Sequence, residues 1–387
     1  MQVKIADRLQ QTTEYYFSKK LSQIAEMNKN GANVLNLGIG SPDLPPPPIV
    51  IETLIQESQN PHNHAYQRYN GAPELRNAIA QWYDREYGVS LDAEKEILPL
   101  IGSKEGIMHI CMTYLQAGDE ALVPNPGYPT YTSAVNLSGA TPRFYELNEE
   151  DQWLPDLEKL AKLDLSRVKI MWVNYPQMPT GAKANHDFFA KLVRFASENN
   201  ILLCHDNPYS FILNDEQISL LSIDGAKECV LELNSFSKTF NMAGWRIGML
   251  LGNQERISEI LRFKSNMDSG MFYPLQIAAS KALSLEKDWY QKINSVYKSR
   301  RLKVYELLDI LNCSYSEDQA GMFVWAKIPE KWQDSYELAD EILDQAHVFI
   351  TPGGIFGSQG NRYIRISLCA TEDFFEDAIN RIISSRK

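Results

Sequence analysis

Lys238 is the residue whose surroundings suggest covalent chemistry. It lies in the serine-rich segment Ser235-Phe236-Ser237-Lys238-Thr239-Phe240, eight residues before Arg246. A lysine held near cationic neighbours and away from water has a lowered pKa, and its neutral amine can form an imine with an aldehyde. A surface lysine at a helix start is the alternative, and this segment alone does not decide between the two.

Asp206 and Tyr209 indicate which kind of molecule would carry such an aldehyde. They follow the apolar run Ile201-Leu202-Leu203-Cys204, where a carboxylate is costly unless a cation pairs with it. A protonated pyridine nitrogen is such a cation, and keeping it protonated makes the ring an electron sink. Tyr209 can donate a hydrogen bond to a phenolic oxygen on that ring. The alternative for Asp206 is a helix N-cap, and we interpret His205 as its strand neighbour, not as a base.

The segment Gly102-Ser103-Lys104-Glu105-Gly106 has the features of a phosphate-binding turn. It opens a predicted helix directly after the apolar run at residues 97–101. A glycine turn at a helix N-terminus presents free backbone N–H groups to a phosphate, and Arg246 can add a bidentate charge. Many helices begin with Gly-Ser, so this motif is weak by itself.

An alternation of helices and short apolar runs must position these residues. From about residue 50 to 285, helical stretches such as 75–87 and 103–115 separate runs that are rich in branched residues. Such runs are typical of buried strands in a largely parallel sheet, and strand–helix alternation indicates an α/β domain. The runs are at residues 120–123, 168–173, 201–204, 230–233 and 247–251.

Polar or aromatic groups follow four of these runs. Ligands of an open parallel sheet bind beyond the carboxyl ends of its strands, so these groups are expected to meet at one edge. This convergence is the strongest indication of a site that the residues themselves provide. The segments concerned are 124–128, 174–181, 205–209 and 234–238.

The C-terminal part of the chain indicates a second, smaller domain. Residues 276–312 form one long, charged, periodic stretch, which we interpret as a connecting helix. Apolar segments at 321–326 and 363–367, with a helical segment near 336–346 between them, favour an α+β fold.

The four prolines at 45–48 predict where an N-terminal arm enters the main body. They favour an extended element, and residues 33–40 before them read as a short strand that ends in glycines. We therefore predict a large cofactor-binding domain over residues 46–285. The small domain would combine residues 1–45 and 286–387.

Composition narrows the class of protein further. The 387 residues suffice for two domains, and a net charge of −11 argues against a general nucleic-acid binder. The five cysteines lack CxxC spacing and the six histidines lack metal-ligand spacing, so we expect free thiols and no metal. The first 20 residues have no apolar signal core, and no run approaches the ~20 apolar residues of a membrane span. We therefore predict a cytoplasmic protein.

Together these segments resemble the class I/II aminotransferases, which are fold-type I pyridoxal-phosphate enzymes. The resemblance runs from Leu37-Gly38-Ile39-Gly40-Ser41-Pro42-Asp43 to Tyr363-Ile364-Arg365-Ile366, and residues 235–246 carry its most specific signature. It implies an α/β domain with a mostly parallel seven-stranded sheet flanked by helices, plus a smaller α+β domain. It also implies pyridoxal 5′-phosphate as cofactor and a homodimer with shared active sites.

The resemblance also implies a role for each candidate residue. Lys238 binds the aldehyde carbon of the cofactor and then moves a proton between the substrate Cα and the cofactor C4′. Asp206 pairs with the pyridine nitrogen, Tyr209 hydrogen-bonds the ring oxygen, and Arg365 holds the substrate α-carboxylate with Gly40 beside it. The remaining cofactor contacts are Tyr128 stacked on the ring, Ser103, Lys104 (through its backbone), Ser235, Ser237 and Arg246 on the phosphate, and Tyr66 on the phosphate of the partner subunit.

Met178 departs from the pattern of the family. Met178-Pro179-Thr180-Gly181 stands where these enzymes usually have Asn-Pro-Thr-Gly, and that asparagine normally bridges the ring oxygen and the substrate carboxylate. Methionine cannot donate either hydrogen bond. We hypothesise that Asn174 or Gln177 points into the site instead, with Asn174 as a cofactor-binding residue, and a more apolar site is the alternative.

The resemblance leaves several reactions open, because the same cofactor serves transaminases, lyases, decarboxylases and racemases. We expect amino transfer between an L-amino acid and a 2-oxo acid, with glutamate and 2-oxoglutarate as one pair. Residues 264–270 (Lys-Ser-Asn-Met-Asp-Ser-Gly) resemble the LL-diaminopimelate aminotransferases and their aspartate-, alanine- or methionine-using relatives. A carbon–sulfur β-lyase is the alternative. A non-catalytic regulatory protein is a remote one, since Lys238, Asp206 and Arg365 are all present.

Overall fold

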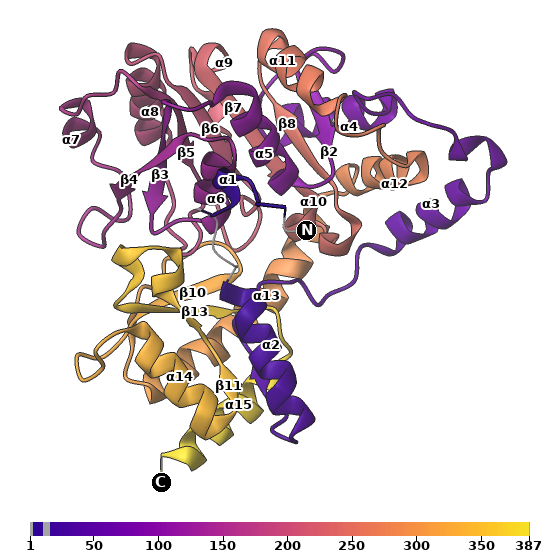
Figure 1. Ribbon diagram of the computed structural model, residues 1–387. Coiled ribbons are helices and arrows are strands. Elements are labelled where there is room, and N and C mark those ends of the chain that lie inside the picture. Colours follow the sequence, from indigo (N-terminus) through magenta and orange to yellow (C-terminus); the bar gives the residue numbers. More distant parts are fainter. Residues whose placement is uncertain (1–2, 11–15, 387) are drawn as a thin grey trace.

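A seven-stranded sheet is the centre of the computed structural model, which describes residues 3–10 and 16–386 (Figure 1). Strand β8 is antiparallel to both of its neighbours, and the other adjacent pairs are parallel. The predicted α/β class with a mostly parallel sheet is therefore confirmed. The order across the sheet is β2 (Ile97–Leu100), β8 (Gly248–Leu251), β7 (Val230–Ser235), β6 (Leu202–Asp206), β5 (Val168–Val173), β3 (Glu120–Asn125) and β4 (Thr141–Glu146).

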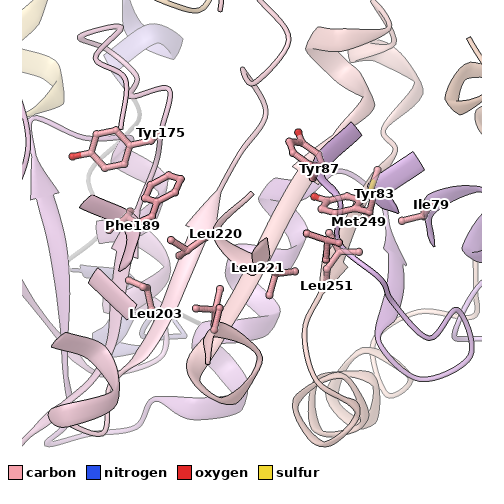
Figure 2. Packing of buried hydrophobic residues seen from close by; sticks show 14 of the residues in the cluster. Ile79, Tyr83, Tyr87, Tyr175, Phe189, Leu203, Leu220, Leu221, Met249 and Leu251 are labelled. Atoms are coloured by element: carbon pink, nitrogen blue, oxygen red, sulfur yellow. The ribbon is translucent and has the colours of Figure 1, made fainter. Parts of the chain in front are cut away.

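Helices cover both faces of this sheet. Successive side chains of a strand point to opposite faces, so each buried strand packs against both layers of helices. Leu203 packs toward the face covered by α4 (Pro73–Tyr87) and α8 (His186–Glu198), where Figure 2 shows it near Phe189. Its neighbour Cys204 packs toward α5 (Ser103–Tyr114), α6 (Pro129–Leu137) and α11 (Gln254–Lys264) on the other face. Both faces are buried, which explains the continuous apolar runs in the sequence.

A smaller four-stranded antiparallel sheet lies beside the C-terminal helices α14 (Ser335–Ala346) and α15 (Glu372–Ser385). The N-terminal arm joins this part of the molecule: β1 (Leu35–Asn36) pairs with β11 (Val348–Phe349), and Lys20 on α2 (Tyr16–Lys29) forms an ion pair with Asp340. The predicted domain boundaries stay a prediction. The small sheet has the order β12 (Thr351–Pro352), β13 (Tyr363–Ser367), β10 (Phe323–Lys327) and β9 (Ser314–Tyr315).

The prediction of one helix over residues 276–312 is wrong. The stretch contains two helices, α12 (Tyr273–Leu283) and α13 (Lys287–Ile310), and α13 runs from the large sheet toward the small one (Figure 1). The Arg85 guanidinium donates to the carbonyl oxygens of Leu283 and Leu285. These bonds satisfy acceptors that a continuous helix would have used internally, and apolar periodicity does not report such a break.

Several short or exposed strands, β4, β9, β11 and β12 among them, were not predicted from the sequence. The edge strand β4 is largely exposed, so it has no apolar run that would predict it. The strand expected at residues 33–40 is shorter than expected and consists of β1 alone. Among the described residues no helix is long and apolar enough to cross a membrane. The other α-helices are α1 (Asp7–Gln10), α3 (Pro48–Ser58), α7 (Leu157–Ala161), α9 (Ala226–Cys229) and α10 (Phe236–Thr239).

Candidate active site

A pocket of about 650 Å³ opens at the carboxyl ends of the central strands, between the large sheet and the small one. Its lining brings together residues from distant parts of the chain, as the convergence of strand ends predicted. Tyr66 is the one candidate residue outside it. The candidate residues that line it are Gly40, Ser103, Lys104, Tyr128, Asn174, Asp206, Tyr209, Ser235, Ser237, Lys238, Arg246 and Arg365.

Lys238 enters the pocket from α10, the short helix that follows β7 directly. Its Nζ lies 2.6 Å from the carbonyl oxygen of Gly40. Burial lowers the pKa of this amine to about 8, and the positive charges of Arg365 and Arg246 act in the same direction. A substantial fraction of the amine is therefore neutral near pH 7–8, which is the state that attacks an aldehyde.

Asp206 is the last residue of β6 and caps no helix, so the N-cap interpretation is excluded. Its Oδ2 accepts a hydrogen bond from the Tyr131 hydroxyl at 2.9 Å, whereas Oδ1 is buried without a partner among the described residues. Burial raises the pKa of this carboxyl to about 6, and the Tyr131 hydrogen bond and the charge of His205 oppose that rise. An unpartnered carboxylate oxygen in a pocket is suited to a cationic N–H.

His205 lies on the opposite side of β6 from the pocket and is fully buried. Its Nδ1 is 2.9 Å from the Glu232 carboxylate and its Nε2 is 3.0 Å from the carbonyl oxygen of Tyr175. Both partners are hydrogen-bond acceptors, so the ring is held between the Glu232 carboxylate and the backbone. Glu232 was not among the predicted site residues, although a lone carboxylate within the apolar run 230–233 indicates a buried partner.

A phosphate-sized cradle forms where α5 begins. Gly102 has φ +82°, and a Cβ there would lie 2.2 Å from Arg246 Nη2, so only glycine allows the guanidinium to approach this closely. The N-terminal end of α5, the hydroxyls of Ser103, Ser235 and Ser237, and the Arg246 guanidinium surround the same space. Backbone N–H groups, hydroxyls and a guanidinium are donors that fit a phosphate monoester.

Arg365 is buried in the middle of β13 on the opposite side of the pocket. Its Nη2 donates to the carbonyl oxygen of Gly38 at 2.8 Å, and its Cζ lies 3.8 Å from the centre of the Phe323 ring. A Cβ at Gly40 would lie 2.1 Å from that ring, so Gly40 permits the close packing. Arg300 on α13 holds Asp43 through two 2.7 Å contacts, which anchor the loop after Gly40.

Met178 lines the pocket with its Sδ 3.1 Å from Arg365 Nη1. Gln177 is directed away: its amide donates to the carbonyl oxygen of Pro126 and accepts from Thr180. Asn174 does line the pocket, but it donates to the Asp206 carbonyl and accepts from the Met178 amide. Gln177 therefore does not replace the missing asparagine. Both polar side-chain atoms of Asn174 are already hydrogen-bonded to the backbone.

Comparison with known proteins gives the family of the chain. Residues 32–382 match the family model for aminotransferase class I and II. The chain belongs to this family. It is 41% identical to an LL-diaminopimelate aminotransferase of Dehalococcoides mccartyi, with 98% of both chains covered. It is 40% identical to another from Natranaerobius thermophilus, which covers 97% of this chain and 98% of the relative.

Solved structures show the same fold over nearly the whole chain. Substrate-bound BacF from Bacillus subtilis superimposes with a TM-score of 0.94 at 38% identity, covering 99% of this chain and 98% of the other. A mutant aspartate aminotransferase of Thermus thermophilus gives a TM-score of 0.92 at 26% identity, covering 99% and 100%. The aminotransferase is thus a pyridoxal-phosphate-dependent enzyme, and its unpartnered Asp206 oxygen, phosphate cradle and buried lysine fit that cofactor.

Proposed function

We propose that the enzyme transfers an amino group between an L-amino acid and a 2-oxo acid, with glutamate and 2-oxoglutarate as one pair, and that Lys238 moves the proton at the substrate Cα. The observation that carries this proposal is the buried, partly neutral Lys238 amine in one pocket with Asp206 and Arg365. With the cofactor bound, the buried amine could act as a base or an acid at the substrate Cα.

The other residues of the pocket have supporting roles in this proposal. When bound, pyridoxal phosphate supplies the aldehyde that takes the amino group and the ring that accepts the electrons released at Cα. Asp206 Oδ1 holds the pyridine N–H, and Arg365 orients the substrate through its α-carboxylate. Burial raises the pKa of Tyr209, so its phenol keeps the proton that it donates to the ring oxygen.

Replacing Lys238 by Ala tests the central assignment. We expect loss of turnover together with loss of the visible absorbance of the lysine-bound cofactor, whereas Lys292→Ala, an exposed lysine on α13, should retain both. The assay follows oxidation of the donor with 2-oxoglutarate as acceptor. Sustained turnover in the Lys238 variant would remove the basis of the proposal. Release of ammonia from a cystathionine-type substrate without any 2-oxo acid would instead favour the β-lyase.

We further propose that a second copy of the chain completes each site through Tyr66. Its side chain is 91% exposed, and the exposed apolar side chains Ile49, Ile51, Ile55 and Phe272 occur on neighbouring elements. Helix α3, which carries the isoleucines, packs on α12 and projects from the body of the molecule (Figure 1). Exposed apolar surface of this kind supports an interface between protein chains.

The segment 264–270 supports the loop that carries Tyr66. Buried Lys264 contacts both carboxylate oxygens of Asp268 at 2.8 and 2.6 Å. Gly270, at φ +87°, then packs so closely on the backbone of Gln67 and Arg68 that a Cβ would lie 2.8–2.9 Å from their carbonyl oxygens. The ion pair thus fixes the backbone beside Tyr66.

Hybrid dimers test the shared site. Lys238→Ala and Tyr66→Ala subunits are each expected to form impaired homodimers. When the two variants are unfolded together and refolded, a mixed dimer contains one site with both native side chains. We expect activity to return toward a quarter of the wild-type value at equal mixing. Activity no higher than the sum of the separate variants, in samples shown to contain mixed dimers, would refute the shared site.

A further inference from the structure

Trp153 follows a strand of the large sheet but packs on the small sheet. It lies in the loop between β4 and α7, and it contacts hydrophobic side chains of both parts of the molecule. The Trp153 ring centre is 5.1 Å from that of Tyr363 at an interplanar angle of 79°, and 6.2 Å from that of Trp325 at 84°. Both are edge-to-face geometries, which aromatic pairs favour. The loop thus reaches from one sheet to the other through the Trp153 ring.

The two aromatic residues that Trp153 contacts lie on the same face of the small sheet as Arg365. Tyr363 is two residues before Arg365 on β13, and Trp325 on β10 is directly opposite Arg365 in the antiparallel ladder. Side chains in these positions point to the same face of a sheet. The rings of Trp325 and Tyr363 stack at 5.1 Å with an angle of 6°. They therefore form one continuous aromatic surface beside the arginine.

Phe356 connects this aromatic surface to the guanidinium. Its ring centre lies 6.1 Å from that of Trp325 and 4.7 Å from Arg365 Cζ. A series of ring contacts therefore runs from Trp153 to the group that is proposed to hold the substrate α-carboxylate. Arg365 is 4% exposed, and a side chain in a close-packed interior shifts only together with its neighbours. Loss of the Trp153 ring would therefore loosen the packing that fixes the guanidinium.

The backbone of Trp153 has a conformation that bulky residues rarely adopt. Its φ is +61°, and that of Gln152 is +54°, in the left-handed region that disfavours residues with a Cβ. The Trp153 N–H donates to the carbonyl oxygen of Asn148 at 2.8 Å, and its own carbonyl oxygen accepts from the Tyr175 hydroxyl at 2.8 Å. A conformation of this kind persists where the surrounding contacts fix it, which is common at functional sites. The loop therefore holds the ring in one place.

Glu149 of the same loop forms a second connection to the small sheet. Its Oε2 accepts from the Tyr363 hydroxyl at 3.0 Å and lies 3.2 Å from Lys327 Nζ. The side chains of Glu149 and Lys327 are about half exposed, so water and ions screen this ion pair. We therefore expect the apolar contacts of the Trp153 ring to contribute more to this junction than the charges do.

We propose that Trp153 is a positioning residue: through the aromatic side chains of the small sheet, it holds the Arg365 guanidinium in place for the substrate α-carboxylate. The proposal rests on the proposed function, in which Arg365 binds that group. Every amino donor and every 2-oxo acid carries an α-carboxylate, so loss of the ring affects all substrates alike. A small error in the placement of the substrate lowers the rate even when the reacting groups are intact.

Single-turnover rate constants of the holoenzyme test this proposal. L-glutamate and each further L-amino acid with which the wild-type enzyme reacts are mixed with each variant, and the change in cofactor absorbance is followed. We expect Trp153→Ala to lower the second-order rate constant about tenfold for every donor, with less than about a threefold change in the limiting rate at saturation. Unequal losses among donors, or losses below about twofold, would overturn the proposal. A wild-type enzyme that reacts with no donor would instead count against the proposed function.

Conservative replacements show whether the ring itself is needed. Trp153→Phe keeps an aromatic edge and should stay within about threefold of the wild-type rate constants. Trp153→Leu keeps apolar volume without a ring and should behave like Trp153→Ala, which it replaces if the alanine variant does not fold. Wild-type rate constants in Trp153→Leu would overturn the proposal. The cofactor dissociation constant should be the same in all three variants, because the phosphate cradle lies on the large sheet.

Two comparisons separate positioning from a general loss of stability. Tyr315→Ala is the matched control, because this half-buried aromatic residue of the small sheet stacks on Tyr305 at 4.5 Å, and it should change no rate constant more than about twofold. In an Arg365→Ala background, Trp153→Ala should lower the rate by less than about twofold further, because the residue through which it acts is gone. An undiminished tenfold loss in that background would show that Trp153 does not act through Arg365.

Discussion

Replacing Glu232 by Gln tests how far the buried hydrogen bonds around this carboxylate stabilise the protein. The carboxylate accepts four hydrogen bonds at 2.8–2.9 Å, from the hydroxyls of Tyr83 and Ser219, the amide of Leu220 and the ring of His205. A glutamine side chain accepts through only one terminal atom, so two of these donors lose their acceptor. Removing one partner of a buried pair costs about 3–5 kcal/mol, and hydrogen bonds to charged groups contribute about 1.5–3 kcal/mol each.

We therefore expect Glu232→Gln to lower the free energy of unfolding by about 3–5 kcal/mol. Urea unfolding of the holoenzyme at fixed protein concentration measures it. Glu146→Gln is the matched control, because Glu146 is 56% exposed and 3.9 Å from Lys159, and should change stability by less than about 0.5 kcal/mol. A loss below about 1 kcal/mol in Glu232→Gln would refute the assignment of four hydrogen bonds to a buried carboxylate.

The same variant has a second readout at Asp206. The positive charge of His205 opposes the burial that raises the Asp206 pKa to about 6. In Glu232→Gln the His205 ring loses its carboxylate partner at 2.9 Å. We expect His205 then to oppose the rise less, so that the pKa of Asp206 moves higher. Because a protonated carboxyl does not pair with a cationic N–H, cofactor binding to the apoenzyme should then weaken at a higher pH than in the wild type. An unchanged pH profile would show that the pair acts on stability alone.

Three further outcomes follow from the site. In the apoenzyme, the reaction of Lys238 with pyridoxal phosphate should become faster as pH rises through about 8 and level off above it, because the neutral amine is the reactive form. A stopped-flow rate constant that does not change from pH 6 to 9 would contradict this. Asp206→Asn keeps an acceptor for Tyr131 but removes the charge, so kcat/KM should fall at least about 100-fold, and a loss under tenfold would count against its role. Met178→Asn restores an amide at the pocket and should lower KM for amino donors about tenfold, whereas an unchanged KM would show that the amide is not needed.

Much of the fold and site could be predicted because they depend on local pattern. Buried parallel strands must be apolar on both faces, so the runs at β5, β6 and β7 were visible, and the residues after them had to meet at one edge. The wrong prediction at 276–312 has a different origin. The break between α12 and α13 depends on the Arg85 side chain, which comes from a helix about two hundred residues earlier in the chain.

The sequence by itself determined which chemical groups reach the active site: an amine at Lys238, a carboxylate at Asp206, and a phosphate cradle near Gly102. Only the tertiary structure decided how each group is paired. The amides of Asn174 and Gln177 could have faced the pocket or the backbone, and hydrogen bonds to distant carbonyls settled their directions. The tertiary structure also decided which apolar side chains line the pocket. They come from separate elements, and their spacing in sequence does not indicate their contact: Phe17, Leu21, Ile39, Phe323 and Phe356. Direction and pairing depend on contacts between segments, which periodicity and composition do not encode.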